Sequence, residues 1–125
     1  MSCDCNNSRV VLVIKQGEQR SFIFNIKDKD GNPVDLVSKE ILVEVKNYPL
    51  LKVKPIISIL LTNVDNGNGY INDQETGQFI LTLTETESSL NPQEYYLIIT
   101  MISGTERIII SGEGNSSGVL KVCRQ

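Results

Sequence analysis

The stretch TGQFILTLTETESSLNPQEYYLIIT, residues 76–100, decides the fold class. It opens with Phe79, Leu81 and Leu83 at every second position, which is the side-chain period of a β-strand with one buried face. A polar run follows, and a second apolar run begins at Tyr95. Because residues 95–103 are apolar on both faces, we expect a central strand that lies buried between two layers.

The polar run between these two strands predicts one short helical turn near residues 85–90. Thr84 and Glu87 have the spacing of a capping box, in which each side chain accepts a hydrogen bond from the backbone N–H of the other residue. Pro92 follows soon after, and a proline disfavours helical backbone in the residue before it. The turn is therefore expected to be short.

The same strand pattern recurs along the chain. In QRSFIFNIKD, residues 19–28, the alternation places Phe22, Phe24 and Ile26 on one face and Ile23 on the other. EILVEVKN, residues 40–47, alternates in the same way. Further strands are expected at residues 10–14, 56–61, 77–84, 107–113 and 119–123, with a polar loop at 63–73 and an irregular crossing or edge strand between Pro49 and Pro55. Short strands between turn signals predict an all-β sandwich.

Length and composition fit one ordinary globular domain. The chain has 125 residues, of which 40% are hydrophobic and 22% charged, so one core needs neither metal nor disulfide. We expect a flexible N-terminal arm at residues 1–8 and a single domain at 9–125. The net charge of −3, without a basic block, argues against nucleic-acid binding. No apolar run approaches a membrane span, and the polar N-terminus is no secretory signal, which indicates a protein made in a cytoplasm.

Two acidic segments are candidate metal sites. Asp65 to Thr76 fails the EF-hand pattern at every ligand position after the first, and a looser site from Asp65, Asp73 and Glu75 is less favoured than a solvated loop. DKDGNPVD, residues 28–35, contains three carboxylates, Asp28, Asp30 and Asp35. The same residue types build a tight turn, and we favour the turn.

The remaining candidate chemistry is sparse. GEGNSSG, residues 112–118, precedes an apolar strand rather than a helix, so it predicts a hairpin connection and not a phosphate loop. Cys3, Cys5 and Cys123 lack the number and spacing of a zinc site, and we favour reduced thiols over a disulfide from the N-terminal pair to Cys123. The sequence contains no histidine, so neither a Ser–His nor a Cys–His pair is available. We predict no catalytic, cofactor-binding or metal-ligating residue and no enzymatic activity.

The order of these pieces resembles a known family. IKQGEQRSFIFNIKDKDGNPVDL, residues 14–36, is similar to the opening of the immunoglobulin-like domain found at the N-terminus of baseplate upper proteins and related tail and fibre proteins of tailed phages. The shared residues there are Gln16, Gly17 and Glu18, followed by Asp28, Gly31, Pro33, Asp35 and Leu36. The second half matches at Gly77, Phe79, Thr84, Glu87, Leu90 and Tyr96, and departs from the family pattern at Thr100.

The resemblance implies an immunoglobulin-like sandwich of about seven to nine antiparallel strands. It also implies a virion structural protein that is assembled in the host cytoplasm. Its expected partners are tail, baseplate, neck, portal or capsid proteins, which it binds in a symmetric oligomer or a multi-copy assembly. Family members carry the domain ahead of a longer chain, and this sequence ends at Gln125, which favours a small adaptor, head-fibre attachment or capsid-decoration role. The alternative is a carbohydrate- or receptor-binding adhesion module, which the absence of Trp disfavours. An enzyme that uses lysine or paired carboxylates is a third hypothesis, and no spacing singles out such residues.

Overall fold

The structure is a computed structural model that describes residues 11–28, 30–47, 54–111 and 118–124, with only the backbone at 109–111. The described residues form strands and turns and contain no helix, hence none of the length and apolarity needed to cross a bilayer. In these described ranges, nine strands follow one another: β1 (Val11–Lys15), β2 (Arg20–Asn25), β3 (Glu40–Lys46), β4 (Ile57–Leu61), β5 (Gly69–Asp73), β6 (Gln78–Leu83), β7 (Gln93–Ser103), β8 (Glu106–Ser111) and β9 (Gly118–Cys123).

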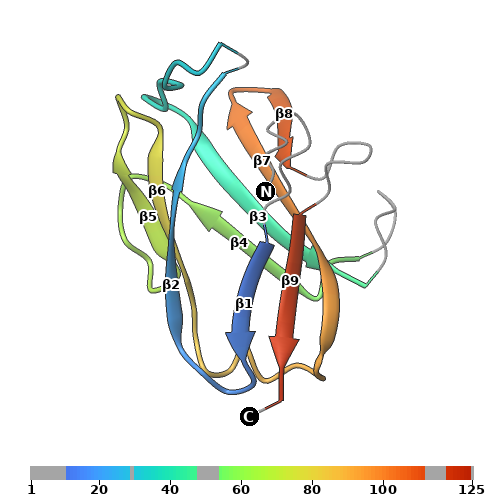
Figure 1. The fold of residues 1–125 in the computed structure, drawn as a ribbon. Helices are drawn as coiled ribbons and strands as arrows, with labels where there is room; N and C mark the ends of the chain where they lie inside the picture. Colours follow the sequence, from blue (N-terminus) through green and yellow to red (C-terminus); the bar gives the residue numbers. More distant parts are fainter. Residues whose placement is uncertain (1–10, 29, 48–53, 112–117, 125) are drawn as a thin grey trace.

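The strands make two sheets that pack face to face (Figure 1). The larger sheet has the order β1-β9-β7-β3-β4, and β8 also pairs with β7. The smaller sheet has the order β2-β6-β5. Every pair is antiparallel except β1 with β9, which run parallel. This is an immunoglobulin-like β-sandwich, so the predicted fold class is confirmed. The predicted flexible arm at residues 1–8 lies outside the described residues.

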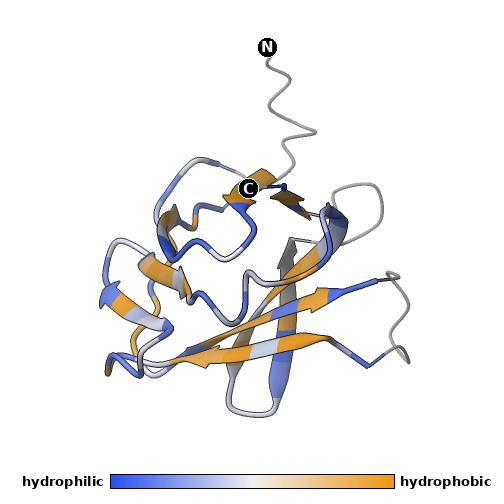
Figure 2. Cartoon of the chain, turned by 90° about the horizontal axis from the view of Figure 1, so that it is seen from below, coloured by the Kyte–Doolittle hydropathy of each residue, from blue (hydrophilic) through white to orange (hydrophobic). Residues whose placement is uncertain are grey.

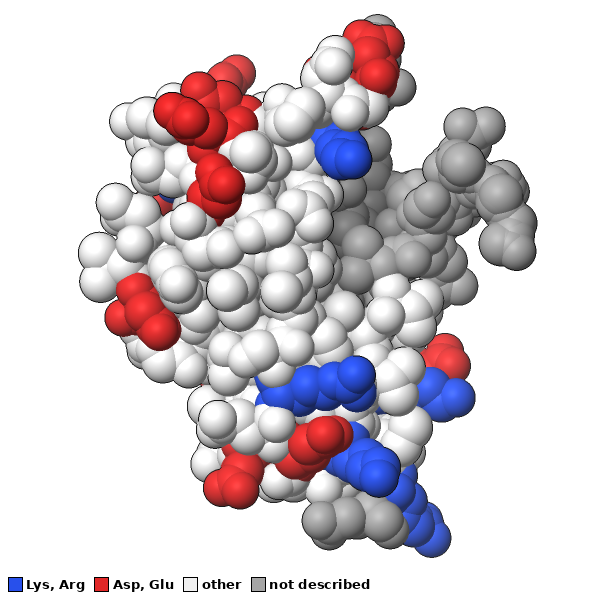
Figure 3. All heavy atoms as spheres, turned by 60° about the vertical axis from the view of Figure 1, so that its left-hand side comes forward, with Lys and Arg blue, Asp and Glu red and all other residues white. Residues whose placement is uncertain are grey.

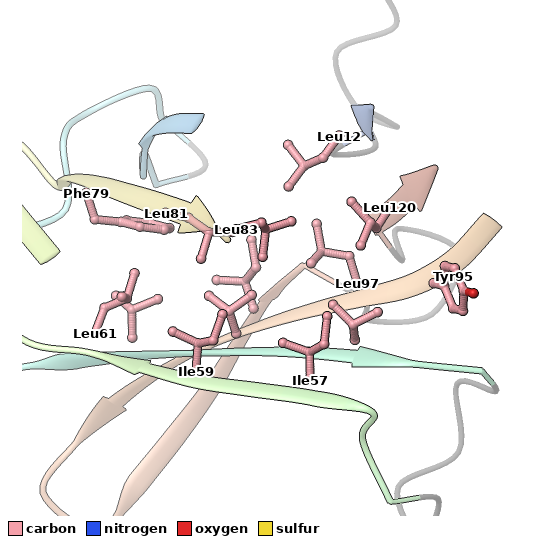
Figure 4. Close-up of a cluster of buried hydrophobic side chains, with 14 of the residues drawn as sticks. Leu12, Ile57, Ile59, Leu61, Phe79, Leu81, Leu83, Tyr95, Leu97 and Leu120 are labelled. Atoms are coloured by element: carbon pink, nitrogen blue, oxygen red, sulfur yellow. The ribbon is translucent and has the colours of Figure 1, made fainter. Parts of the chain in front are cut away.

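The alternation that decided the fold class describes the core correctly. Phe79, Leu81 and Leu83 of β6 are buried, and they face the buried side chains of β3, β4 and β7 across the sandwich (Figure 4). Figure 2 shows the apolar residues concentrated along the strands and the hydrophilic residues in the connections. The fully buried large side chains are Phe79, Ile14, Leu36, Ile41, Leu61, Leu81, Leu83, Leu97, Ile99, Leu120, Val43 and Val45.

The predicted central strand is β7. It pairs with β3 along one side and, along the other, with β9 in its first half and with β8 in its second half. Its inner residues Leu97 and Ile99 are buried, and so are Ile98 and Thr100 on its outer face. Tyr95 lies in the core, whereas Tyr96 is half-buried on the other face of the strand.

Strand β5 was missed in the sequence, where residues 63–73 read as a loop. It has five residues, begins at a glycine, and its pairing with β6 shifts register between Tyr70 and Asp73. The buried Ile71 is the only large apolar residue that β5 sends inward, so no alternation is visible over so short a run. Gly69 is required there, since a Cβ at this position would overlap the carbonyl oxygen of Ile80.

The capping box is formed. The Thr84 N–H donates to Glu87 Oε1 at 2.9 Å, and the Glu87 N–H donates to Thr84 Oγ1 at 3.3 Å. The Ser88 N–H donates to the Thr84 carbonyl at 3.0 Å, which closes one helix-like turn. The chain then leaves the turn, and residues 85–88 remain a single turn without further helix.

Two motifs from opposite halves of the sequence meet at one corner of the sandwich. The Ser88 side chain is fully buried, and its hydroxyl donates to the Glu18 carbonyl at 2.6 Å. The Gly17 N–H donates to the Ser88 carbonyl at 3.3 Å, and the Gln16 side-chain amide donates to the Leu90 carbonyl at 3.0 Å. The Gln-Gly-Glu segment thus joins the β1–β2 connection to the β6–β7 connection.

At the opposite corner of the sandwich, the connection between β2 and β3 contacts the turn between β5 and β6. The Ile26 N–H donates to the Gly77 carbonyl at 2.9 Å, and the Leu36 N–H donates to the Gln74 carbonyl at 2.7 Å. Gly77 has φ +72°, and a Cβ there would lie 2.7 Å from the Val34 carbonyl oxygen. Only glycine suits both this backbone conformation and this close approach.

Tyr95 fastens the start of β7. Its hydroxyl donates to the Asn91 carbonyl at 2.7 Å, four residues upstream, which is the arrangement of the tyrosine corner in immunoglobulin-like domains. Burial of the phenol raises the pKa of Tyr95 above its ordinary value of 10.0.

We expect Gly77→Ala to destabilise the protein by roughly 2–5 kcal/mol, because the new methyl group adds a clash to the cost of a positive φ. Gly31→Ala is the matched control, since Gly31 has φ +84° and open space around its Cβ position. The control is expected to cost about 1–2 kcal/mol. Urea unfolding of both variants measures the difference, and equal losses would contradict the close-approach argument.

We expect Tyr95→Phe to cost about 1 kcal/mol at neutral pH through loss of the hydrogen bond to Asn91. Because the folded pKa of Tyr95 is raised, its contribution to stability is fully present below the unfolded pKa and is lost as pH rises through the folded pKa. The stability difference between wild type and variant should therefore shrink above about pH 10. Unfolding free energies measured from pH 7 to the alkaline limit test this, and a constant difference would refute it.

Candidate interaction surface

The outer face of the three-stranded sheet is uncharged in its central row, and among its described residues Asp73, which ends β5, lies opposite Gln78 at one margin. Pairing of β2, β6 and β5 arranges its outward side chains in three rows across the strands. The central row is apolar and consists of Ile23, Ile80 and Tyr70. Figure 3, with the left-hand side of Figure 1 turned forward, shows a broad uncharged area with charges at its margins.

The two flanking rows are polar and already hydrogen bonded. Ser21 Oγ and Thr82 Oγ1 lie 2.8 Å apart on one side of the apolar row. On the other side the Gln78 amide nitrogen donates to Asn25 Oδ1 at 3.0 Å, and the Asn72 amide nitrogen donates to Gln78 Oε1 at 2.7 Å. Because these groups bond to one another, a partner that covers them loses less free energy to unsatisfied polar groups.

Ile23 is the most exposed apolar side chain of this face, with 65% of its surface accessible. The sequence alternation predicts that Ile23 lies on the face opposite Phe22 and Phe24, and the structure agrees, with Ile23 on the outer face. The neighbouring Tyr70 could not be placed from the sequence, because the register of β5 follows from its bulged pairing with β6. A row of apolar side chains between satisfied polar rows is suited to contact with another protein surface.

The outer face of the six-stranded sheet is also largely apolar. β3 and β4 place Leu42 beside Leu60, and β7 adds Ile98 and Ile102. Val11 and Val13 of β1 are exposed on the same face. Glu44 of β3 lies opposite Ile98 and interrupts these residues, so this face carries a charged side chain among its apolar ones.

Two open hollows lie among the turns at one end of the sandwich. One, of about 560 Å³, is lined by residues of the β2–β3, β4–β5 and β7–β8 connections, and the other, of about 400 Å³, by the β5–β6 turn and Tyr70. Val37, Asn63 and Gln74 line both. Ser38, beside the first hollow, has φ +64°, a left-handed conformation that is uncommon outside glycine.

The carboxylates of DKDGNPVD hold a turn. Asp28 Oδ1 accepts hydrogen bonds from the N–H groups of Asp30 and Asn32, both at 2.9 Å. Asp35 Oδ1 accepts from the Val37 N–H at 2.9 Å. The preference for a turn over a metal site at these residues therefore agrees with their hydrogen bonds.

The second acidic segment is spread along the small sheet. Asp65 precedes β5 and its Oδ1 accepts from the Gly67 N–H at 2.9 Å, whereas Asp73 ends β5 and accepts from the Thr76 N–H at 3.4 Å. Glu75 lies in the turn that follows and is exposed. Within the described ranges, no three His, Cys, Asp or Glu side chains are grouped so that they could hold a metal ion.

Some of the residues considered in the sequence analysis lie outside the described part of the chain. Residues 112–117 of the glycine-rich connection, together with Cys3, Cys5 and Tyr48, lie outside the described residues. Cys123 is half-buried and is a free thiol in the described part of the chain. It pairs in register with Lys15, at the end of β1 away from Val11. The preference for reduced thiols over a disulfide to Cys3 or Cys5 stays a prediction, because those two residues lie outside the described part of the chain.

Comparison with known proteins gives fold-level likenesses. No family model matches the chain, and no curated protein sequence matches it. The N-terminal domain of ORF48 of phage TP901-1 is similar with a TM-score of 0.48 and 11% identity, over 94% of this chain and 85% of that chain. A chain of the ZIG-8–RIG-5 IG1–IG1 heterodimer is similar with a TM-score of 0.44 and 10% identity, over 97% and 89%.

A further likeness is to a chain from the complex of ICOS with ICOS-L and an anti-ICOS-L VNAR domain, with a TM-score of 0.43 and 12% identity. It covers 94% of this chain and 55% of that one. Identities and TM-scores this low transfer no function to the chain.

We expect Asp28→Ala to destabilise the protein by about 1–2 kcal/mol, since two backbone N–H groups lose their acceptor. Asp30→Ala is the control, because Asp30 takes part in this turn through its backbone N–H; a change within about 0.5 kcal/mol is expected for it. Thermal unfolding with calcium or with a chelator should give the same Tm for the wild type. A Tm raised by calcium in the wild type and not in Asp28→Ala would establish the metal site instead.

Proposed function

We propose that the chain is a structural protein of a tailed-phage particle, a small immunoglobulin-like module that joins or decorates virion components through protein–protein contacts. Its place is the tail, baseplate, neck, portal or capsid surface. The protein is made in the host cytoplasm and is then incorporated into the particle. The proposal assigns it no catalytic reaction, cofactor, nucleic acid or membrane.

The observation that carries the proposal is the outer face of the small sheet, with its uncharged central row. Ile23 projects from it with 65% of its surface exposed, and hydrogen-bonded polar rows flank it on both sides. Leaving an apolar side chain such as Ile23 in water is unfavourable in free energy. Covering it is favourable here, because the polar side chains around it already have hydrogen-bond partners. The face is therefore suited to a neighbouring virion protein.

The sequence motifs support the same role because their residues form hydrogen bonds and close backbone contacts at the two corners of the sandwich. Gln16, Gly17 and Ser88 make one corner, and Gly77 makes the other. Together they fix the two layers, and a fixed sandwich loses little conformational entropy when it is packed into an assembly. Gln16, Gly17 and Gly77 are among the residues on which the resemblance to phage virion domains rests.

A carbohydrate- or receptor-binding adhesion module is the second candidate. The observation that favours it is the hollow of about 400 Å³ beside Tyr70, which is lined by the amide side chains of Asn63, Asn72 and Gln74. Amides and an aromatic ring are the groups that bind sugar hydroxyls and ring faces. A glycan array with wild type and Tyr70→Ala tests this candidate, and binding that the variant loses would support it over the structural role.

We expect Ile23→Asp to fold like the wild type and to fail to enter particles, because the aspartate would be buried at the contact without a partner. Val64→Asp is the control, since Val64 is 67% exposed in the β4–β5 loop. Particles are purified on a density gradient from cells in which each variant replaces the natural chain, and the chain is quantified by mass spectrometry. The proposal fails if the wild type is absent from particles, or if both variants enter equally.

A further inference from the structure

The connection between β4 and β5 contains the same dipeptide twice, since residues 66–69 read Asn-Gly-Asn-Gly. Because glycine has no side chain, its backbone nitrogen is unhindered and can attack the side-chain amide carbon of the preceding asparagine. The amide nitrogen then leaves as ammonia, and the succinimide ring that forms is opened by water to aspartate or isoaspartate. In the unfolded chain Asn66 and Asn68 are therefore similarly reactive, and the fold decides any difference between them.

The side chain of Asn68 is held by the capping box. Asn68 is half-buried, and its amide nitrogen donates to Glu87 Oε1 at 2.7 Å and to the Thr82 carbonyl at 3.1 Å. The same Glu87 oxygen accepts from the Thr84 N–H at 2.9 Å. Cyclisation at Asn68 requires its amide to leave two acceptors in a half-buried site, one of them a carboxylate, and such bonds are costly to break.

The backbone after Asn68 is fixed as well. Gly69 is buried, opens β5 and pairs with Leu81 of β6, and a Cβ on it would overlap the Ile80 carbonyl oxygen. The Asn68 carbonyl accepts from the Thr82 N–H at 2.8 Å. The nitrogen of Gly69 therefore cannot swing toward the Asn68 side chain unless this end of the ladder opens.

The backbone after Asn66 is much less restricted. Gly67 is exposed, with no neighbouring atom within 4 Å of its Cβ position, and its N–H donates to the exposed Asp65 side chain at 2.9 Å. Asn66 is exposed too; its amide nitrogen donates to the Leu60 carbonyl at 2.8 Å, and its Oδ1 accepts from the Asn68 N–H at 2.9 Å. Water can replace each of these partners at the surface, so moving Asn66 costs little free energy.

We propose that Asn66 is a site of spontaneous deamidation and that the fold protects Asn68, two residues away, from the same reaction. A bond forms between the Gly67 nitrogen and Asn66 Cγ, the Cγ–Nδ2 bond breaks, and the Gly67 proton leaves with the ammonia. Water then opens the ring at Cγ, which gives aspartate, or at the backbone carbonyl, which gives isoaspartate. Water is the co-reactant, and nothing is oxidised or reduced. The reaction needs no partner, so its test is separate from that of particle assembly.

The modification changes a contact at the edge of the six-stranded sheet. The Asn66 amide is the donor to the Leu60 carbonyl of β4, and β4 is the terminal described strand of its sheet. The carboxylate that replaces the amide has no N–H to donate, and it adds a negative charge next to Asp65. The β4–β5 connection thus loses a hydrogen bond that ties it to β4, and we expect the connection to loosen.

The test compares the two asparagines in one sample. The purified protein is incubated at mildly alkaline pH, folded or in concentrated urea, and deamidation at each site is followed by tandem mass spectrometry. In urea the two sites should react at similar rates. In the folded protein Asn66 should react at least about tenfold faster than Asn68. Isoaspartate should accompany aspartate at residue 66, which distinguishes the succinimide route from direct hydrolysis of the amide.

Equal rates at the two sites of the folded protein would overturn the proposal. So would a faster reaction at Asn68, or a folded protein in which both sites are unreactive while both react in urea. These comparisons use the wild-type chain alone, so they do not depend on the folding of any variant.

A variant tests the cause of the protection. Glu87→Ala removes the carboxylate that accepts from the Asn68 amide, so the rate at Asn68 should rise toward its rate in urea while the rate at Asn66 stays the same. Glu85→Ala is the matched control, since Glu85 is exposed in the same turn, and it should change neither rate. Thermal unfolding shows that both variants are folded at the incubation temperature. An Asn68 rate that Glu87→Ala leaves unchanged would refute the role given to the capping box.

The expected loosening has its own measurement. Asn66→Asp reproduces the aspartate product, and Asn63→Asp adds the same charge at an exposed position of the same connection. Limited proteolysis with a broad-specificity protease should cut residues 62–68 faster in Asn66→Asp than in Asn63→Asp. Equal cleavage of the two variants would contradict the loss of a bond to β4.

Discussion

The two sheets of this sandwich are positioned by close backbone contacts at two opposite corners. At one corner the buried Ser88 hydroxyl donates to the Glu18 carbonyl, and at the other the Gly77 backbone lies against Val34 and Ile26. Between these corners the inner faces pack apolar side chains, a non-directional attraction that fixes no register by itself. The contacts at the corners fix how the two sheets lie relative to each other. The alternation of each strand then decides which of its residues are in the core and which are on the surface.

A sandwich fixed in this way leaves its outer faces free for contact. The small sheet shows an outer face with an uncharged central row, on which the flanking polar groups already bond to one another. In most proteins that act alone, such features are small or blocked, because they favour association. In an assembly with many copies, several weak contacts of this kind act together and strengthen one another.

Local pattern in the sequence was sufficient for much of this architecture. The alternation at Phe79, the two-faced apolar run after Tyr95 and the turn around Gly31 each depend on residues close in sequence, so their outcome was readable. Contacts between distant segments were not readable, among them the approach of Ser88 to Glu18 and the register of β5 against β6. Part of the outer face around Ile23 could be predicted from the sequence, because the β2 residues alternate. The position of Tyr70 could not be predicted, because it depends on the pairing of β5 with β6.

The parallel neighbours β1 and β9 give the domain a mechanical character. Val11 pairs with Val119 and Lys15 with Cys123, so the start of β1 and the end of β9 lie at opposite ends of one ladder. A pull applied between these two points slides the strands along each other and loads every rung at once, whereas an antiparallel hairpin under the same pull opens one rung at a time. Tension applied between these two points is therefore carried by all the rungs of the ladder together.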